Sequence, residues 1–192
     1  MTRVLITAFE PYDRWTDNSS WAALMELTSW YDGVAEVTTR RYPVDLTAMS
    51  SALRSDAAAG YDLALHLGQS PASPIVKLEA VGLNVRTDAS PLIAGAAEAY
   101  RSPLPLGGLA ATLCKRGIPA ELSLHAGTYL CNAALYLSQH YATTLATGTR
   151  AAFVHLPLTP SQSARFPDER LPSMSSTLSA AAVAIAIEEL AE

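Results

Sequence analysis

Short apolar runs typical of strands alternate with helix-like runs along most of this chain. A strand, a helix and a second strand in succession form a parallel pair, and a parallel sheet needs cover on both faces. The alternation therefore predicts a three-layer α/β fold, in which helices cover both faces of a mainly parallel, twisted sheet. The expected strands are 3–7, 34–42, 62–67, 75–85, 120–124 and 151–156, and the expected helices are 19–30, 46–58, 106–116, 130–141 and 173–190.

Two stretches lack a clear period. Residues 86–102 are expected to form a loop, with a hairpin as the alternative, and the proline-rich stretch 157–172 is expected to form a loop. With 192 residues and 49% hydrophobic content, the chain is expected to fold as a single domain spanning 1–192.

Charge and termini exclude several classes of function. Thirteen basic against eighteen acidic side chains give a net charge of −5 without a basic cluster, so we expect neither nucleic acid nor a membrane as partner. The start of the chain lacks the features of a signal peptide, which predicts a cytoplasmic protein with reduced thiols. The apolar run 180–187 is too short to span a bilayer.

A cysteine follows a strand and a small turn, at the expected start of a helix. The segment runs Ala126-Gly127-Thr128-Tyr129-Leu130-Cys131-Asn132, and the helical run follows it. A thiol there lies near the positive end of the helix dipole, which favours the nucleophilic thiolate. The alternative is a buried cysteine that acts as a small hydrophobic residue beside Leu130 and Leu135.

Two further residues make the nucleophile more plausible. His155 ends an apolar strand just before Pro157, and reactive side chains collect at the carboxyl ends of strands in open α/β sheets. Glu79 lies within the apolar run 75–81, where its charge needs a partner. Cys131, His155 and Glu79 together supply a nucleophile, a base and a group that orients the base.

Several motifs in a fixed order resemble the pyroglutamyl peptidase I family, the pyrrolidone-carboxylate cysteine peptidases. The resemblance implies a three-layer phosphorylase/hydrolase-like fold and removal of an amino-terminal pyroglutamate from peptides. It also implies a catalytic domain without metal or organic cofactor, and a homo-oligomer, either a dimer or a tetramer. The motifs are Leu5 to Tyr12, His66 to Gln69, Leu78 to Val85, Gly117 to Pro119, Ala126 to Asn132 and His155 to Pro157.

The resemblance also implies a role for each site residue. Cys131 is the expected nucleophile, His155 the general base and Glu79 the carboxylate that holds the imidazole, and the reaction passes through a thioester. The expected substrate-binding residues are Phe9 and Tyr12 around the lactam ring, Gln69 hydrogen-bonded to it, and Tyr129 and Leu130 in the nearby wall. Core packing is the alternative for Phe9 and Tyr12.

The chain departs from the family where many members carry an arginine that stabilises the oxyanion. Ala89 occupies that place, so the expected oxyanion donors are the backbone N–H of Cys131 and, as a substitute, Arg86. Loss of one such donor costs about a hundredfold or more in rate. Two alternatives therefore stay open: a non-catalytic relative that binds pyroglutamyl peptides or serves as a scaffold, and a cysteine amidase for another small lactam or amide.

Three other residues compete for a chemical role. His66 lies inside an apolar strand, where we expect a packing residue, and His125 precedes the turn of Cys131 closely enough to be a second candidate base. Cys114 lies on a predicted helix without a nearby acid or histidine motif, so we expect it to pack.

Overall fold

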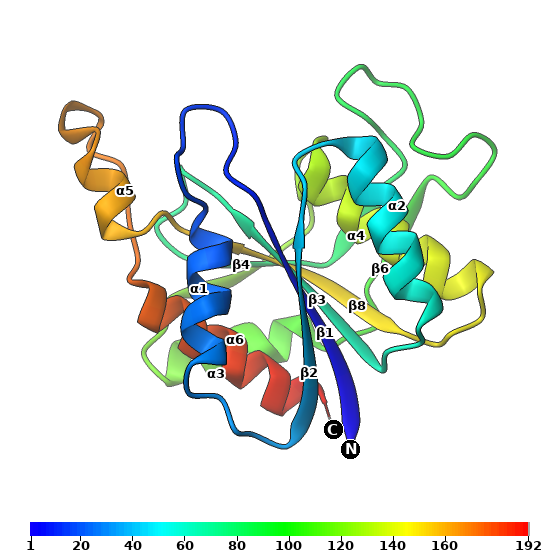
Figure 1. Cartoon of the computed structure of the whole chain (residues 1–192), viewed down its shortest axis with the longest axis horizontal. Coiled ribbons are helices and arrows are strands. Elements are labelled where there is room, and N and C mark those ends of the chain that lie inside the picture. Colours follow the sequence, from blue (N-terminus) through cyan, green and yellow to red (C-terminus); the bar gives the residue numbers. More distant parts are fainter. Residues whose placement is uncertain (192) are drawn as a thin grey trace.

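The computed structural model describes residues 1–191, and this part of the chain contains a six-stranded main sheet between two layers of helices (Figure 1). The strand order is β2-β1-β3-β8-β4-β7, and within this sheet of the described residues only the pair of β4 with β8 is antiparallel. The predicted three-layer α/β fold is confirmed. The strands are β1 (Thr2–Phe9), β2 (Ala35–Tyr42), β3 (Leu63–Gln69), β4 (Val76–Glu79), β7 (Ala120–Ser123) and β8 (Arg150–Leu156).

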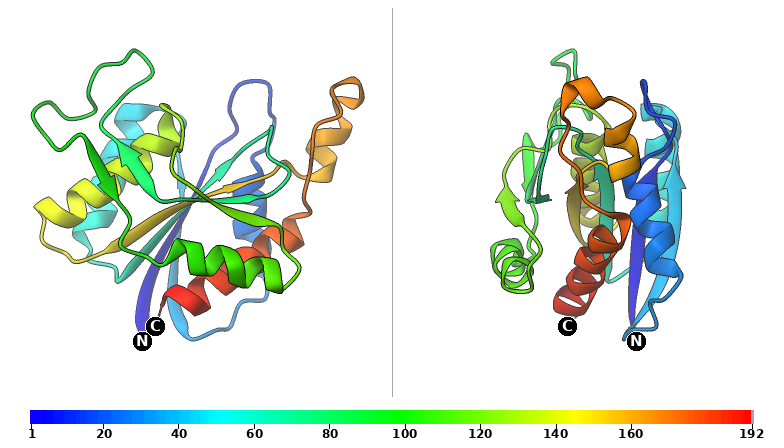
Figure 2. Two further views of the ribbon diagram at one scale, coloured as in Figure 1. Left: turned by 180° about the vertical axis from the view of Figure 1, so that it is seen from behind. Right: turned by 90° about the vertical axis from the view of Figure 1, so that its left-hand side faces the viewer.

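The helices divide between the two faces of the sheet (Figures 1 and 2). Helices α1 (Ser19–Thr28), α3 (Leu106–Lys115) and α6 (Ser176–Leu190) cover one face, and α2 (Leu46–Ala58) and α4 (Leu130–Thr144) cover the other. Side chains cap two of these helices, since Asn18 accepts the Ser20 N–H at the start of α1 and Asp45 accepts the Ala48 N–H at the start of α2. None of the helices within residues 1–191 combines the length and the hydropathy needed to cross a membrane.

The strand expected over 75–85 is wrong, because the chain leaves the main sheet at Ala80. The Ala80 N–H donates to the Ser123 carbonyl (2.9 Å), and the Ala80 carbonyl accepts from the Ser102 N–H (2.7 Å). Beyond it, β5 (Val81–Leu83) pairs antiparallel with β6 (Ala99–Arg101). The alternative of a hairpin near 86–102 thus holds in part, with its first strand outside that range.

Close packing of β5 on α4 depends on a glycine. A Cβ at Gly82 would lie 2.6 Å from the backbone nitrogen of Tyr136, so a side chain there would push the helix away. The two-stranded ribbon is thereby seated directly on the helix that begins at the cysteine.

The proline-rich stretch 157–172 is also more regular than expected. It contains the short helix α5 (Pro160–Ala164) and the 3-10 turn η1 (Pro167–Glu169). Helix α5 begins with a capping box, in which the Thr159 side chain accepts from the backbone of Gln162 and the Gln162 side chain accepts from the backbone of Thr159. In Figure 1 this segment projects beside the loop that follows β1.

Candidate active site

Cys131 lies in the first turn of α4, where the N–H groups have no acceptor within the helix. Its side chain is partly exposed, so the alternative of a fully buried cysteine is excluded. Gly68 at the end of β3 leaves room for the sulfur, because a Cβ there would come within 3.2 Å of Cys131 Sγ and 2.4 Å of the Phe153 ring. The thiol therefore lies over the carboxyl end of the sheet.

Asn132, the next residue, fixes this turn to the β5 segment. Its side chain is fully buried; Oδ1 accepts the Leu83 N–H (2.8 Å), and Nδ2 donates to the carbonyls of Leu83 (2.9 Å) and Val85 (3.1 Å). Asn132 was not among the residues predicted to act at the site. Its place directly after the cysteine, in an otherwise apolar helix start, was the available signal.

The predicted base and carboxylate form a hydrogen-bonded pair. His155 Nδ1 lies 2.8 Å from Glu79 Oε1, and the Glu79 side chain is 1% exposed. In the ladder, antiparallel β4 sets Glu79 opposite Phe153, two positions before His155. The pairing leaves Nε2 of the imidazole available to the thiol.

The charge state of His155 follows from these neighbours. Burial alone would lower the pKa of His155, because it disfavours the imidazolium. Hydrogen bonding to the Cys131 sulfur and to Glu79, together with their negative charges, outweighs burial and raises the pKa of His155 to about 9. A protonated imidazole beside a sulfur and a buried carboxylate is suited to proton transfer during nucleophilic attack.

A cavity of about 200 Å³ opens beside the sulfur. We call it the Cys131 cavity, and every residue predicted to bind substrate contributes to its wall. Phe9 closes it from the core, packed against the rings of Tyr42 and Phe153. No carboxylate lines this cavity within residues 1–191. The lining residues are Phe9, Tyr12, Asn18, Val44, Gly68, Gln69, Tyr129, Leu130 and Cys131.

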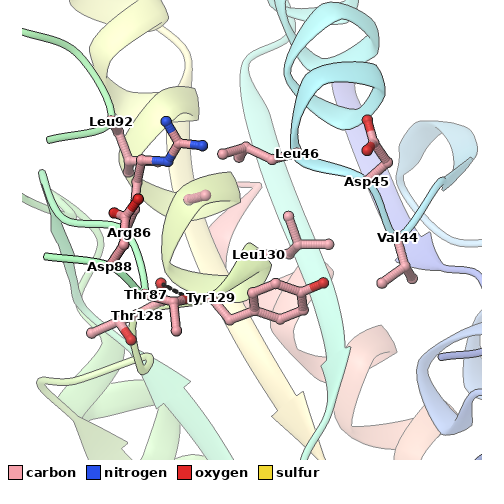
Figure 3. Close-up of a pocket in the computed structure, with 11 residues that line it drawn as sticks. Val44, Asp45, Leu46, Arg86, Thr87, Asp88, Leu92, Thr128, Tyr129 and Leu130 are labelled. Carbon is pink, nitrogen blue, oxygen red and sulfur yellow. Dashed lines mark hydrogen bonds between the residues drawn. The ribbon is translucent and has the colours of Figure 1, made fainter. Parts of the chain in front are cut away.

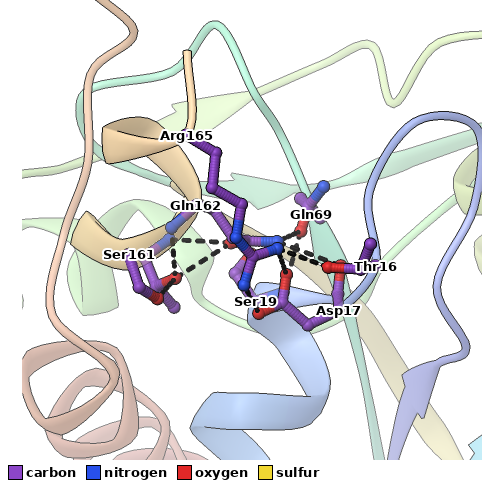
Figure 4. A network of polar contacts seen from close by, with 8 residues as sticks. Thr16, Asp17, Ser19, Gln69, Ser161, Gln162 and Arg165 are labelled. Atoms are coloured by element: carbon purple, nitrogen blue, oxygen red, sulfur yellow. Dashed lines mark hydrogen bonds and ion pairs between the residues drawn. The ribbon is translucent and has the colours of Figure 1, made fainter. Parts of the chain in front are cut away.

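The polar groups of the Cys131 cavity come chiefly from Gln69 and Tyr12. Gln69 Oε1 accepts the Ser19 N–H (2.8 Å) and Nε2 of Gln162 (2.7 Å), whereas Gln69 Nε2 has no acceptor among residues 1–191 (Figure 4). Burial, followed by the nearby Cys131 sulfur, raises the pKa of Tyr12. The Gln69 amide nitrogen is thus a donor in this cavity wall that lacks a partner in the described part of the chain.

The geometry of this site agrees with the similarity of the chain to proteins of known family. A sequence model described as pyroglutamyl peptidase matches residues 2–192. The chain belongs to the pyroglutamyl peptidase family. It is thus a cysteine-type hydrolase.

Relatives from distant organisms support this membership. The chain is 37% identical to a pyrrolidone-carboxylate peptidase of Clavibacter michiganensis over 170 residues, which cover 82% of this chain and 79% of the relative. A mutant pyrrolidone carboxyl peptidase of Pyrococcus furiosus superposes with a TM-score of 0.91 at 30% identity, covering 98% of both chains. The enzyme of Fervidobacterium islandicum gives 0.90 at 32% identity, covering 98% of this chain and 97% of the other.

The predicted oxyanion residue Arg86 lies away from the Cys131 cavity in this family member. It lines a larger neighbouring pocket of about 270 Å³, the outer pocket, where its guanidinium extends toward Leu46 (Figure 3). Ala89 is exposed in the turn that follows, with a φ of 64°. The two hollows share Val44, Tyr129 and Leu130. The outer pocket is lined by Val44, Asp45, Leu46, Arg86, Thr87, Asp88, Leu92, Thr128, Tyr129, Leu130 and Ala133.

The competing residues occupy other positions. His66 is fully buried, with Nδ1 2.8 Å from Thr7 Oγ1, and burial lowers the pKa of His66 to about 4. His125 is exposed, and its Nδ1 accepts the Gly127 N–H (3.0 Å). Cys114 does not pack as predicted: it is exposed, and its thiol donates to the Ala120 carbonyl (3.3 Å). Among residues 1–191 no three His, Cys, Asp or Glu side chains gather to hold a metal ion.

Proposed function

We propose that this protein is an exopeptidase that hydrolyses the amide bond after an amino-terminal pyroglutamyl residue. The observation that carries the proposal is the Cys131 cavity, which combines the candidate nucleophile with a small, largely apolar wall. Pyroglutamate is a neutral lactam, so its site needs no carboxylate for a charged amine. A flat ring with one N–H and one C=O fits aromatic walls and an amide partner.

In the proposed cycle, Cys131 attacks the pyroglutamyl carbonyl while His155 holds the thiol proton. The tetrahedral intermediate collapses as the C–N bond breaks, and His155 gives that proton to the leaving amine. A water molecule, deprotonated by His155, then attacks the thioester and releases pyroglutamate and the free thiol. Glu79 keeps the imidazole oriented and stabilises its protonated form.

The negative charge on the reacting carbonyl oxygen needs donors. We assign this role to the backbone N–H of Cys131 in the first turn of α4, where the helix dipole is also favourable. Arg86 is a candidate second donor only if its side chain turns from the outer pocket toward the sulfur, so we assign the role to the Cys131 N–H first.

The proposed binding of the ring follows the cavity wall. Phe9 and Tyr12 enclose the lactam, Gln69 forms a hydrogen bond with it, and Tyr129 and Leu130 complete the side toward solvent. The outer pocket adjoins this side, so we place the peptide downstream of pyroglutamate there. A homo-oligomer and a cytoplasmic location stay predictions.

The direct test is hydrolysis of pyroglutamyl-coumarin amide by the purified full chain, with Cys131→Ala as the control. We expect turnover by the wild type and a loss of about a thousandfold or more in the variant. Turnover that is equal in the two proteins would contradict the proposal.

Arg86 lines the outer pocket and not the Cys131 cavity, which favours one alternative function. In this alternative the protein binds pyroglutamyl peptides without cleaving them. Calorimetry with free pyroglutamate separates the two, because tight binding without turnover is expected only of the binder. A panel of other cyclic amides tests the remaining alternative, a cysteine amidase for a different small lactam. A cysteine amidase of this kind should hydrolyse one of these cyclic amides faster than any pyroglutamyl amide.

A further inference from the structure

Gln162 of α5 is buried beneath the Cys131 cavity without lining it. Its side chain is fully buried, and Nε2 donates to Gln69 Oε1 (2.7 Å) and to the Asp17 carbonyl (3.0 Å). Its Oε1 accepts the Thr159 N–H (2.9 Å) and the Thr159 hydroxyl (3.2 Å). A flip of this amide would set an oxygen against two carbonyl oxygens, so its orientation is fixed.

The orientation of Gln162 determines that of Gln69. With Gln162 Nε2 and the Ser19 N–H both directed at Gln69 Oε1, a flip of the Gln69 amide would set its NH₂ group against two donors. Gln69 is therefore held with Oε1 toward Gln162 and Nε2 turned away from it, where Nε2 has no acceptor within residues 1–191 (Figure 4).

Exposed side chains also join α5 to the loop after β1. The Arg165 guanidinium pairs with the Asp17 carboxylate (3.0 Å) and donates to the Thr16 hydroxyl. The capping box fixes the Gln162 side chain to the start of the helix. Because the α5 segment follows β8, residues from two distant parts of the chain meet behind Gln69.

We propose that Gln162 is a positioning residue that sets the specificity of the Cys131 cavity. Through Gln69 it presents the cavity with an amide donor and no amide acceptor, which matches the ring carbonyl of a lactam. A saturated five-membered ring without that carbonyl, as in an amino-terminal proline, leaves the donor unpaired and is rejected. This proposal rests on the proposed function, since it specifies how the same site recognises pyroglutamate.

The test compares two substitutions at Gln162 with one at a neighbour. Gln162→Glu keeps the acceptor of the capping box but removes the NH₂ donor, and Gln162→Met removes both. Arg165→Met, at the C-terminal end of α5, breaks the exposed pair with Asp17 and controls for loosening of α5. Thermal unfolding of each variant shows whether it is folded at the assay temperature.

We expect Gln162→Glu to raise KM for pyroglutamyl-coumarin amide about tenfold or more with little change in kcat, because the lost contact holds the ring in ground and transition states alike. A protonated carboxyl regains the donor, so the defect should shrink as the pH falls. Gln162→Met should raise KM at every pH, and Arg165→Met should change it less than about twofold. A purely structural role for Gln162 predicts no such pH dependence.

The proposal is overturned if both Gln162 variants are folded and keep wild-type KM across the pH range. It is also overturned if Arg165→Met raises KM as much as they do. If the wild type cleaves no pyroglutamyl amide, the proposed function fails on its own. In that case the orientation of Gln69 by Gln162 is tested from the side-chain amide NMR signals of Gln69. These signals should shift in Gln162→Glu, and they stay unchanged if Gln162 does not orient Gln69.

Discussion

The Cys131 cavity and the outer pocket share a wall at Val44, Tyr129 and Leu130 but are built from different parts of the fold. The Cys131 cavity lies on strand ends: Phe9 ends β1 and Gln69 ends β3, and both side chains are buried. The outer pocket is formed largely by connecting segments, and charged Asp45, Arg86 and Asp88 at its margin are exposed.

We expect the geometry of the Cys131 cavity to tolerate little change, whereas that of the outer pocket can vary. Strand ends are held by the ladder and by packing beneath them, so a small displacement there is transmitted to the sulfur. Exposed charges on loops are screened by solvent and bind weakly. We therefore expect substitutions in and behind the Cys131 cavity to cost far more activity than substitutions in the outer pocket.

The largest effect is expected for Glu79→Gln. The amide keeps the shape but supplies no charge, and it also permits the wrong tautomer of His155, so kcat/KM should fall about a thousandfold. Steady-state kinetics with pyroglutamyl-coumarin amide measures the loss. A decrease of less than tenfold would show that the hydrogen bond to His155 is not needed for catalysis.

Gly68→Ala should reduce kcat/KM about a hundredfold, because the new methyl group collides with the Phe153 ring and crowds the sulfur. Gly108→Ala is the matched control, since nothing lies within 4 Å of a Cβ at that helical glycine. Equal activity of the two variants would mean that Phe153 moves aside without disturbing Cys131.

The pH dependence tests the charge state of His155. Because its pKa is raised to about 9, the imidazolium that protonates the leaving amine persists up to that pH and is lost above it. We expect kcat/KM to fall about tenfold per pH unit above this limit. In Glu79→Gln one of the groups that raise the pKa is absent, so the decline should begin at lower pH. An unchanged profile would contradict the assignment.

Asn132→Ala should lower the free energy of unfolding by about 1–3 kcal/mol, since it leaves buried backbone groups of Leu83 and Val85 without partners. Asn84→Ala is the matched change on the outer side, where the side chain bonds the backbone of Ile93 in the same way. Urea unfolding measures both losses. We expect Asn132→Ala to reduce kcat/KM more than Asn84→Ala, and the reverse order would break the comparison.

The smallest effect is expected for Arg86→Met, within about threefold for a substrate with an uncharged leaving group. Any change should appear as an altered preference for charge downstream of pyroglutamate, measured with peptides that differ there. A loss near a hundredfold would instead identify Arg86 as the second oxyanion donor and move it functionally into the Cys131 cavity.

The sequence alone predicted the layers of the fold because strand and helix periods are local. It also selected Cys131, His155 and Glu79, since each stands out against apolar neighbours and the motif order matched a known family. Two parts escaped. Strand β4 ends at Glu79, and the chain leaves the sheet because the Ala80 carbonyl accepts from the Ser102 N–H, a contact between distant residues that no local pattern predicts.

The second omission was Gln162, within the stretch expected to be a loop. Proline recurs in that stretch, yet Thr159 and Gln162 have the spacing of a capping box and were a usable signal for a short helix. Its contact with Gln69 joins residues 93 positions apart. Such a contact becomes visible only once β3 and the segment after β8 lie side by side.

Because β4 runs antiparallel to β8, the active site forms only when these two strands pair in the correct register. Glu79 faces His155 only while Lys77 stands opposite His155 in the ladder. Since side chains alternate between faces, a slip by one residue would turn the carboxylate to the other side of the sheet and bring Leu78 or Ala80 in its place. Turnover would thus report on correct pairing of these two strands during refolding, even where overall helix and sheet content looks native.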